Sequence, residues 1–147
     1  FWLHDQSFFY AILAAVFITT RLINMQKSIP HYTLQIADAF GLAFFAVMGT
    51  QKALLAGMPN MTAIIMGVIT GCFGGMIRDV LAREIPMLLK GELYAITCIA
   101  GGVVYTLGIH FSFATELAMV MAMLTTLLLR IAAIKWQITV HVFKYSD

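Results

Sequence analysis

Gly67-Val-Ile-Thr-Gly-Cys-Phe-Gly-Gly-Met-Ile-Arg-Asp79 is the stretch around which the rest of the chain is organised. Gly67, Gly71 and Gly75 recur every four residues and so share one face of a helix, with Gly74 beside the last of them. Because glycine costs about 1 kcal/mol relative to alanine inside a helix, intrinsic propensity does not explain four glycines so close together. One interpretation is close packing, since small-residue faces let neighbouring backbones approach in a membrane. The other adds a break at Gly74-Gly75, whose freed backbone groups would line a polar cavity.

The composition indicates a membrane protein. The 147 residues are 61% hydrophobic and 11% charged, whereas globular proteins carry about 25% charged residues. We therefore predict a single integral membrane domain over residues 1–147. The lysines and arginines are scattered without a basic run, so nucleic acid is not indicated as a partner. Cys72 and Cys98 lie in apolar segments and form no ligand pattern with histidine, so we predict neither a disulfide nor a metal site.

Five apolar stretches are near the length that a bilayer requires, allowing for tilt. They cover residues 7–23, 38–56, 61–77, 92–111 and 115–134, which predicts an all-α membrane protein with five transmembrane helices. Between them we expect a polar connection over 24–37, a tight turn at 57–60 and an amphipathic interfacial segment over 78–91. Asp38 is placed to act as an N-cap or first-turn acid, and Glu92 and Glu116 to open their helices similarly.

The basic residues predict the orientation. When the segments are numbered alternately, eight of the nine fall on one face: Arg21, Lys27, Arg78, Arg83, Lys90, Arg130, Lys135 and Lys144. Basic residues favour the cytoplasmic side of multi-pass proteins. We therefore expect residue 1 and the turn at 57–60 outside, and the C-terminus inside with 137–147 as a cytoplasmic tail.

Three charged residues need separate explanations. Lys52 lies inside the second segment, one turn short of its outer end. Its side chain could snorkel to the interface, or it could be a gating or pathway charge, because an ionisable group within a membrane is expensive. Arg78 and Asp79 are adjacent and on a helix would point about 100° apart. We therefore expect each to find its partner elsewhere, at another helix terminus or a lipid headgroup.

Three motifs resemble those of a known family. They are Asp38-Ala-Phe-Gly-Leu-Ala-Phe-Phe-Ala-Val-Met-Gly-Thr-Gln-Lys-Ala-Leu54, Gly71-Cys-Phe-Gly-Gly-Met-Ile-Arg-Asp-Val-Leu81 and Glu84-Ile-Pro86. In order and spacing they are similar to the second repeat of the bacterial TRIC-type proteins, relatives of the trimeric intracellular cation channels, also known as the glycine transporter or UPF0126 family. The resemblance runs from about residue 1 to about residue 135.

The resemblance implies a seven-helix fold made of two inverted three-helix repeats and a closing helix. Residues 1–23 would be the last helix of the first repeat, 38–111 the second repeat and 115–136 the closing helix. The first two family helices have no counterpart in this sequence, so we expect the chain to be a fragment of a longer protein.

The implied function is that of a homotrimeric channel in the bacterial inner membrane, with one pore per protomer, passing potassium and other monovalent cations. Gly71, Gly74 and Gly75 would form the helix bend that lines the pore, with Arg78 and Asp79 the charged pair just beyond it. Lys52 would be the lysine of the fourth family helix. The implied partners are other copies of the chain and membrane lipids, lipid being also a candidate bound molecule. No cofactor is implied beyond permeant potassium or sodium ions.

Other classes of function compete with the channel. Inverted repeats and discontinuous helices are also typical of secondary transporters, here of a small amino acid such as glycine. A structural membrane subunit would be favoured if this chain were the whole product. An enzyme is not indicated, because no Ser/Lys, His/Asp or paired-Asp arrangement falls at helical spacing within the membrane segments, and we predict no catalytic residue.

Overall fold

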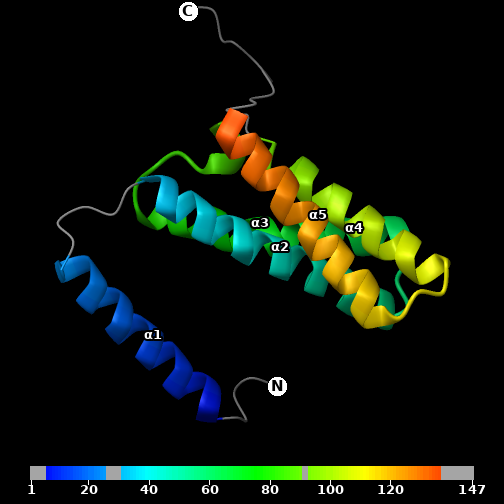
Figure 1. The fold of residues 1–147 in the computed structure, drawn as a ribbon, viewed down its shortest axis with the longest axis horizontal. Helices are drawn as coiled ribbons and strands as arrows, with labels where there is room; N and C mark the ends of the chain where they lie inside the picture. The colour runs from blue at the N-terminus through cyan, green and yellow to red at the C-terminus, as the bar shows by residue number, and fades with distance from the viewer. Residues whose placement is uncertain (1–5, 26–30, 91–92, 137–147) are drawn as a thin grey trace, which may run out of the picture. The chain divides into compact units, whose positions relative to one another are not determined.

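The computed structural model describes residues 6–25, 31–90 and 93–136, which form helices joined by short turns (Figure 1). The elements are α1 (Gln6–Met25), α2 (His31–Leu55), α3 (Asn60–Leu81), the short 3-10 helix η1 (Met87–Lys90), α4 (Tyr94–His110) and α5 (Thr115–Trp136). No strand occurs in this part of the chain. The predicted all-α fold is confirmed.

Three stretches of the described residues are long and apolar enough to cross a membrane: Thr33–Leu55, Asn60–Leu81 and Thr115–Trp136. They are the second, third and fifth predicted segments. Helix α4 is apolar but has only 17 residues, fewer than the roughly 20 that a bilayer core requires. The chain is thus an all-α membrane protein, and the crossings by α1 and α4 stay predictions.

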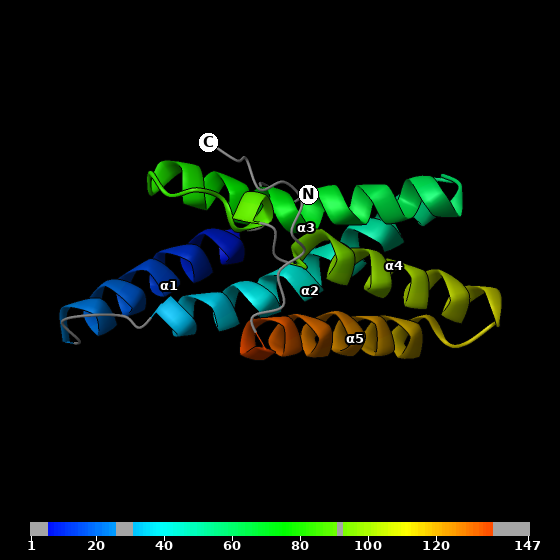
Figure 2. The same ribbon diagram turned by 90° about the horizontal axis from the view of Figure 1, so that it is seen from above.

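The chain forms two compact units, residues Phe1–Leu34 and Gln35–Asp147. The first contains α1, on which the guanidinium carbon of Arg21 lies 5.3 Å from the centroid of the Phe17 ring. The second contains almost all of α2 and the helices α3, α4 and α5. In both views α4 and α5 run side by side within this second unit (Figure 2).

Glycine lets α3 approach α2 closely. A Cβ atom added to Gly67 would overlap Thr50 Oγ1 and stand 2.5 Å from the Ala46 carbonyl oxygen. One added to Gly71 would stand 3.1 Å from Ala46 Cβ. The Thr50 hydroxyl donates a hydrogen bond to the Ala46 carbonyl at 2.9 Å, so its polar atom is satisfied within its own helix. The packing interpretation of Gly67 and Gly71 is therefore confirmed.

Helices α4 and α5 use the same arrangement. A Cβ atom on Gly101 would overlap Thr126 Oγ1, and that hydroxyl donates to the Ala122 carbonyl at 2.9 Å. Further along, a Cβ atom on Gly108 would stand 2.9 Å from Ala118 Cβ. The α2–α3 pair and the α4–α5 pair are thus packed in the same way. In each pair a glycine of one helix lies against a threonine of the other, and the threonine hydroxyl donates a hydrogen bond to a carbonyl of its own helix.

The predicted break in the glycine-bearing helix is wrong. Helix α3 is α-helical without interruption from Asn60 to Leu81, through both Gly74 and Gly75. Close packing accounts for Gly67 and Gly71 without an interruption of the helix, and a bend at Gly71, Gly74 and Gly75 stays a prediction. The helix also continues four residues past the predicted end at Ile77, so Arg78 and Asp79 belong to it and not to an interfacial segment.

Helix α2 begins earlier than predicted. It starts at His31, directly after Pro30, so most of the polar connection predicted over 24–37 is helical where it is described. No glycine or proline stands between His31 and Gly41 to stop the helix, and moderate polarity alone does not end it. Asp38 is therefore an interior residue of α2, and the prediction that it caps the helix is wrong.

The turn predicted at 57–60 is confirmed. Gly57 has φ of 80°, a conformation that favours glycine, and its N–H donates to the Leu54 carbonyl at 2.9 Å. The Met58 N–H donates to the Ala53 carbonyl at 3.1 Å, and α3 begins at Asn60. Glu116 lies in the first turn of α5, as predicted, whereas Glu92 lies outside the described residues.

Candidate functional site

Charged and aromatic side chains from α2, α3, α4 and α5 meet near one end of the second unit. This charged cluster consists of Asp38 on α2, Arg78 and Asp79 on α3, Tyr94 on α4 and Arg130 on α5. The antiparallel course of the helices places the first part of α2 and α4 beside the last part of α3 and α5. Residues up to 92 positions apart in the sequence thus form one site.

Asp38 lies at the centre of the charged cluster. Its Oδ1 atom accepts a hydrogen bond from Arg78 Nη1 at 2.6 Å, and its Oδ2 atom accepts one from the Tyr94 hydroxyl at 2.8 Å. Only 7% of the Asp38 side chain is exposed. A buried carboxylate without partners would be strongly destabilising, so these two bonds make its position inside the helix tenable.

Arg78 joins both carboxylates of the cluster. Its Nε and Nη2 atoms donate to Asp79 Oδ1 at 2.9 and 2.7 Å, while Nη1 reaches Asp38. The expectation that neighbouring Arg78 and Asp79 point apart is wrong, because the long arginine side chain folds back onto Asp79. Arg78 also bonds a group elsewhere in the fold, but that partner is the Asp38 carboxylate in the interior of α2 and not a helix terminus or a lipid headgroup.

Arg130 is buried within the bundle, 1% exposed. Its guanidinium carbon lies 4.7 Å from the centroid of the Tyr94 ring, a distance at which a cation is attracted to an aromatic face. The sequence pattern placed Arg130 among the interfacial basic residues. It stands instead between the apolar runs Leu127–Leu129 and Ile131–Ile134, and that position was the signal in the sequence for a charge buried within the bundle.

The three glycines of the predicted site have different surroundings. Gly71 packs against α2, as described above. A Cβ atom on Gly75 would stand 2.5 Å from the Tyr94 hydroxyl and 3.3 Å from Asp38 Oδ1, so Gly75 leaves room for the Tyr94–Asp38 hydrogen bond. A Cβ atom on Gly74 would meet nothing within 4 Å, and Gly74 is exposed. Gly74 therefore marks an open face of α3.

Lys52 is not part of the charged cluster. It is exposed and lies in the last turn of α2, fourteen residues beyond Asp38, which is about 21 Å along a helix axis. The structure therefore does not bring Lys52 together with Arg78 and Asp79. Exposure in a terminal turn is the geometry that snorkelling requires, and the gating role stays a prediction.

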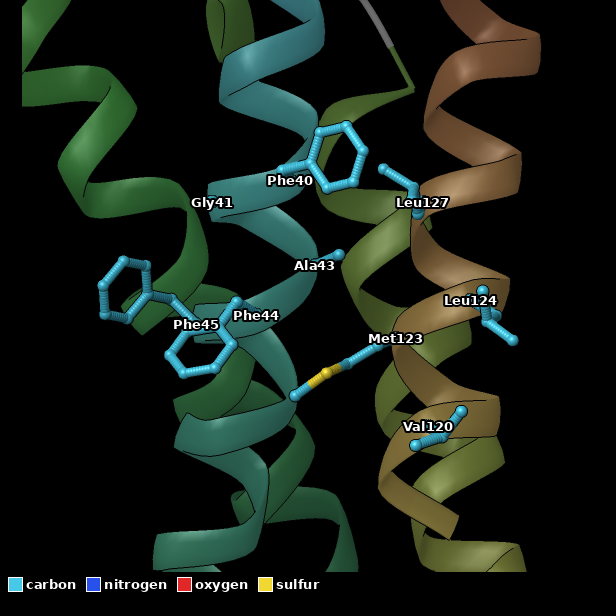
Figure 3. Close-up of a pocket in the computed structure, with 9 residues that line it drawn as sticks. All are labelled: Phe40, Gly41, Ala43, Phe44, Phe45, Val120, Met123, Leu124 and Leu127. Atoms are coloured by element: carbon cyan, nitrogen blue, oxygen red, sulfur yellow. The ribbon is translucent and has the colours of Figure 1, made fainter. Parts of the chain in front are cut away.

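A pocket of about 570 Å³ lies between α2 and α5 (Figure 3). It is lined by Phe40, Gly41, Ala43, Phe44, Phe45, Val120, Met123, Leu124 and Leu127. None of these side chains carries a charge or a hydrogen-bonding group, so the pocket suits hydrocarbon and not an ion. It is separate in character from the charged cluster.

Sequence comparison places the chain in a family. The family model described as glycine transporter matches residues 35–110. A UPF0126 membrane protein of Vibrio cholerae is 41% identical over 143 residues, which are 97% of this chain and 60% of that protein. The UPF0126 inner membrane protein YadS of Escherichia coli K12 is 42% identical over 148 residues, covering all of this chain and 72% of YadS. The chain therefore belongs to the glycine transporter (UPF0126) family, and it spans 60% to 72% of these relatives.

Solved structures of TRIC channels share its fold. The TRIC trimeric intracellular cation channel orthologue from Rhodobacter sphaeroides superposes with a TM-score of 0.82 at 31% identity, covering 94% of this chain and 71% of the channel. A prokaryotic TRIC channel crystallised in 0.5 M KCl gives 0.80 at 30% identity, covering 92% of this chain and 68% of that one. The fold is thus that of the TRIC channels, which the motifs at 38–54 and 71–81 predicted.

Proposed function

We propose that this chain is the greater part of a cation channel subunit of the TRIC type, conducting potassium and other monovalent cations. The observation that carries the proposal is the likeness to TRIC channel structures, with TM-scores of 0.80 and 0.82 at 30% and 31% identity. The membrane-spanning character of three helices is compatible with it. No enzyme is implied, because the family is one of membrane proteins and channels.

The conduction path we propose runs along the open face of α3 marked by Gly74. Since α3 is continuous from Asn60 to Leu81, we place the path along its surface and not through a gap in its backbone. The charged cluster lies at one end of this path, and its two buried carboxylates are balanced by Arg78 and Arg130. We expect weak selectivity among monovalent cations, because two paired carboxylates do not form a ring of matched ligands.

The setting of this channel is also part of the proposal. Assembly as a homotrimer is supported by the description of the Rhodobacter sphaeroides protein as a trimeric channel. A bacterial inner membrane location is supported by the description of the Escherichia coli relative. The bias of basic residues supports residue 1 outside and the C-terminus inside.

The test is potassium flux through the full-length protein in potassium-loaded liposomes under an imposed gradient. Gly74→Leu is the informative variant, because a Cβ atom added there meets nothing within 4 Å. Its matched control is Gly41→Leu on α2, where an added Cβ also meets nothing within 4 Å. We expect flux to be lost in Gly74→Leu and kept in Gly41→Leu. Equal flux in both variants would exclude the α3 face as the pore lining.

A second candidate is a secondary transporter of glycine, which the description of the matching family model favours. The same vesicles decide between the two functions when radiolabelled glycine exchange is measured beside potassium flux. Saturable glycine exchange in vesicles that hold their potassium gradient would establish a transporter. Fast, non-saturating potassium flux without glycine exchange would establish the channel.

A further inference from the structure

The two cysteines of the chain meet across α3 and α4. The Sγ atoms of Cys72 and Cys98 are 4.0 Å apart, although the residues are separated by 26 positions. Both residues are free cysteines, 5% and 1% exposed respectively. The spacing in the sequence gave no indication of this contact, because neither residue belongs to a Cys-x-x-Cys pattern.

On both sides of the cysteine pair, a glycine of one helix lies against a side chain of the other. Toward one end, a Cβ atom on Gly75 of α3 would stand 2.5 Å from the Tyr94 hydroxyl of α4. Toward the other end, a Cβ atom on Gly102 of α4 would stand 3.1 Å from a methyl carbon of Ile64 on α3. The cysteines lie between these two contacts on antiparallel helices. The thiols face one another between these two contacts, and their sulfur atoms must approach from 4.0 Å to about 2 Å for an S–S bond to form.

The surroundings determine which reagents can reach the thiols. Cys72 and Cys98 pack in one apolar cluster with Leu42, Ala46 and Tyr94. Val68 and Leu88 cover this cluster in part. Both thiols are almost fully buried, so any reagent reaches them only when the helices open transiently. Because α3 lies in a membrane-spanning segment, an apolar oxidant concentrated in the bilayer is the one present beside the pair.

We propose that Cys72 and Cys98 are a reversible oxidation site, converted to a disulfide by a lipid-soluble quinone. Both S–H bonds break and one S–S bond forms between the two sulfurs. The two electrons and two protons that the thiols lose pass to the quinone, which becomes a hydroquinone. A dithiol reductant reverses the step by thiol–disulfide exchange.

The consequence for transport rests on the proposed channel function. The disulfide would fix α3, which carries the open face at Gly74, to α4. Any movement of α3 against α4 that conduction requires would then be blocked. Oxidation is therefore expected to reduce potassium flux, and reduction to restore it.

The chemical test uses the full-length protein in membrane vesicles treated with decylubiquinone. After denaturation and alkylation with N-ethylmaleimide, peptide mass spectrometry reports the state of each thiol. We expect a linked peptide joining Cys72 to Cys98, lighter by two hydrogen atoms than its separate halves, and its disappearance after dithiothreitol. Cys72→Ala and Cys98→Ala are the controls, since each retains one thiol. Full alkylation of both cysteines after quinone treatment would overturn the proposal.

The functional test measures potassium flux before and after the same treatment. We expect the wild-type protein to lose most of its flux and to regain it with dithiothreitol, while Cys98→Ala is unaffected. A linked peptide with undiminished flux would overturn the regulatory consequence. An untreated protein without flux would contradict the channel assignment and leave the linked peptide to decide the oxidation site, so the two failures are distinguishable.

Discussion

The Tyr94 hydroxyl on α4 donates a hydrogen bond of 2.8 Å to the Asp38 carboxylate on α2, across 56 residues of sequence. The bond joins two groups of charges. On one side Asp38, Arg78 and Asp79 are linked within the α2–α3 pair. On the other side Tyr94 lies under the Arg130 guanidinium within the α4–α5 pair. This phenol therefore couples the two helix pairs.

Removing the hydroxyl should weaken that coupling. Tyr94→Phe keeps the ring beneath Arg130 but leaves one oxygen of Asp38 without its donor from α4. Hydrogen bonds to charged groups contribute about 1.5–3 kcal/mol, so we expect a clear fall in the thermal midpoint of the detergent-solubilised protein. Tyr94→Leu, which also removes the ring from Arg130, should lower the thermal midpoint further. A Tyr94→Phe midpoint equal to that of the wild type would contradict the role of the hydrogen bond.

The Asp38–Arg78 ion pair should show energetic coupling. Breaking a buried pair on one side is destabilising by about 3–5 kcal/mol, because it leaves a charge without its partner. Arg78 is 31% exposed and also bonds Asp79. The loss of stability in Asp38→Asn should therefore lie at or below the lower end of that range. In a double-mutant cycle we expect the combined loss in Asp38→Asn with Arg78→Gln to be smaller than the sum of the single losses.

Lys135→Gln provides the control for that cycle. Lys135 is exposed on the last turn of α5, and its removal changes the net charge as Arg78→Gln does. The effects of Asp38→Asn and Lys135→Gln should therefore add. Additivity in both pairs would show that the contact between Asp38 and Arg78 contributes nothing specific to stability.

Alanine at the two adjacent glycines should have effects of opposite sign. In Gly75→Ala the new methyl group would stand 2.5 Å from the Tyr94 hydroxyl, so the side chain or the helix must move and stability should fall. In Gly74→Ala the methyl group meets open space, and the gain in helix propensity should raise stability by up to about 1 kcal/mol. Thermal unfolding of both variants measures the difference. A stabilised Gly75→Ala would show that the contact with Tyr94 is not tight.

The role of Lys52 is decided by the voltage dependence of currents in planar bilayers. If Lys52 is a gating or pathway charge, Lys52→Gln should alter the steepness of the current–voltage relation, whereas a snorkelling lysine should leave it unchanged. Lys135→Gln again serves as the control for loss of a positive charge. The exposed position in the last turn of α2 leads us to expect unchanged voltage dependence.

The hydrophobic pattern predicted the helices well, since lipid demands long apolar segments with internally satisfied backbones. The turn at 57–60 was predictable from its glycine and proline. The starts of the helices were harder to predict from the sequence. The residues between Pro30 and Asp38 are moderately polar and include no glycine or proline, and such a stretch is compatible with a loop or a helix.

The charged cluster could not be predicted from the local sequence pattern. Asp38 looks like a cap until Arg78 and Tyr94 are known to lie beside it, and both are distant in the sequence. The glycine series was ambiguous for a related reason. A break and a close contact require the same small residues, and only the neighbouring helices, here Ala46, Thr50 and Tyr94, distinguish them.

The division of charge between the two helix pairs has a consequence for the assembly of the helices in the membrane. In the cluster, the α2–α3 pair holds two carboxylates and one guanidinium, and the α4–α5 pair holds the Arg130 guanidinium. Counted over these cluster residues alone, the first hairpin carries one net negative charge and the second one net positive charge before they meet. Docking of the second hairpin on the first neutralises both, so electrostatic attraction within the lipid can guide the order and register of their assembly.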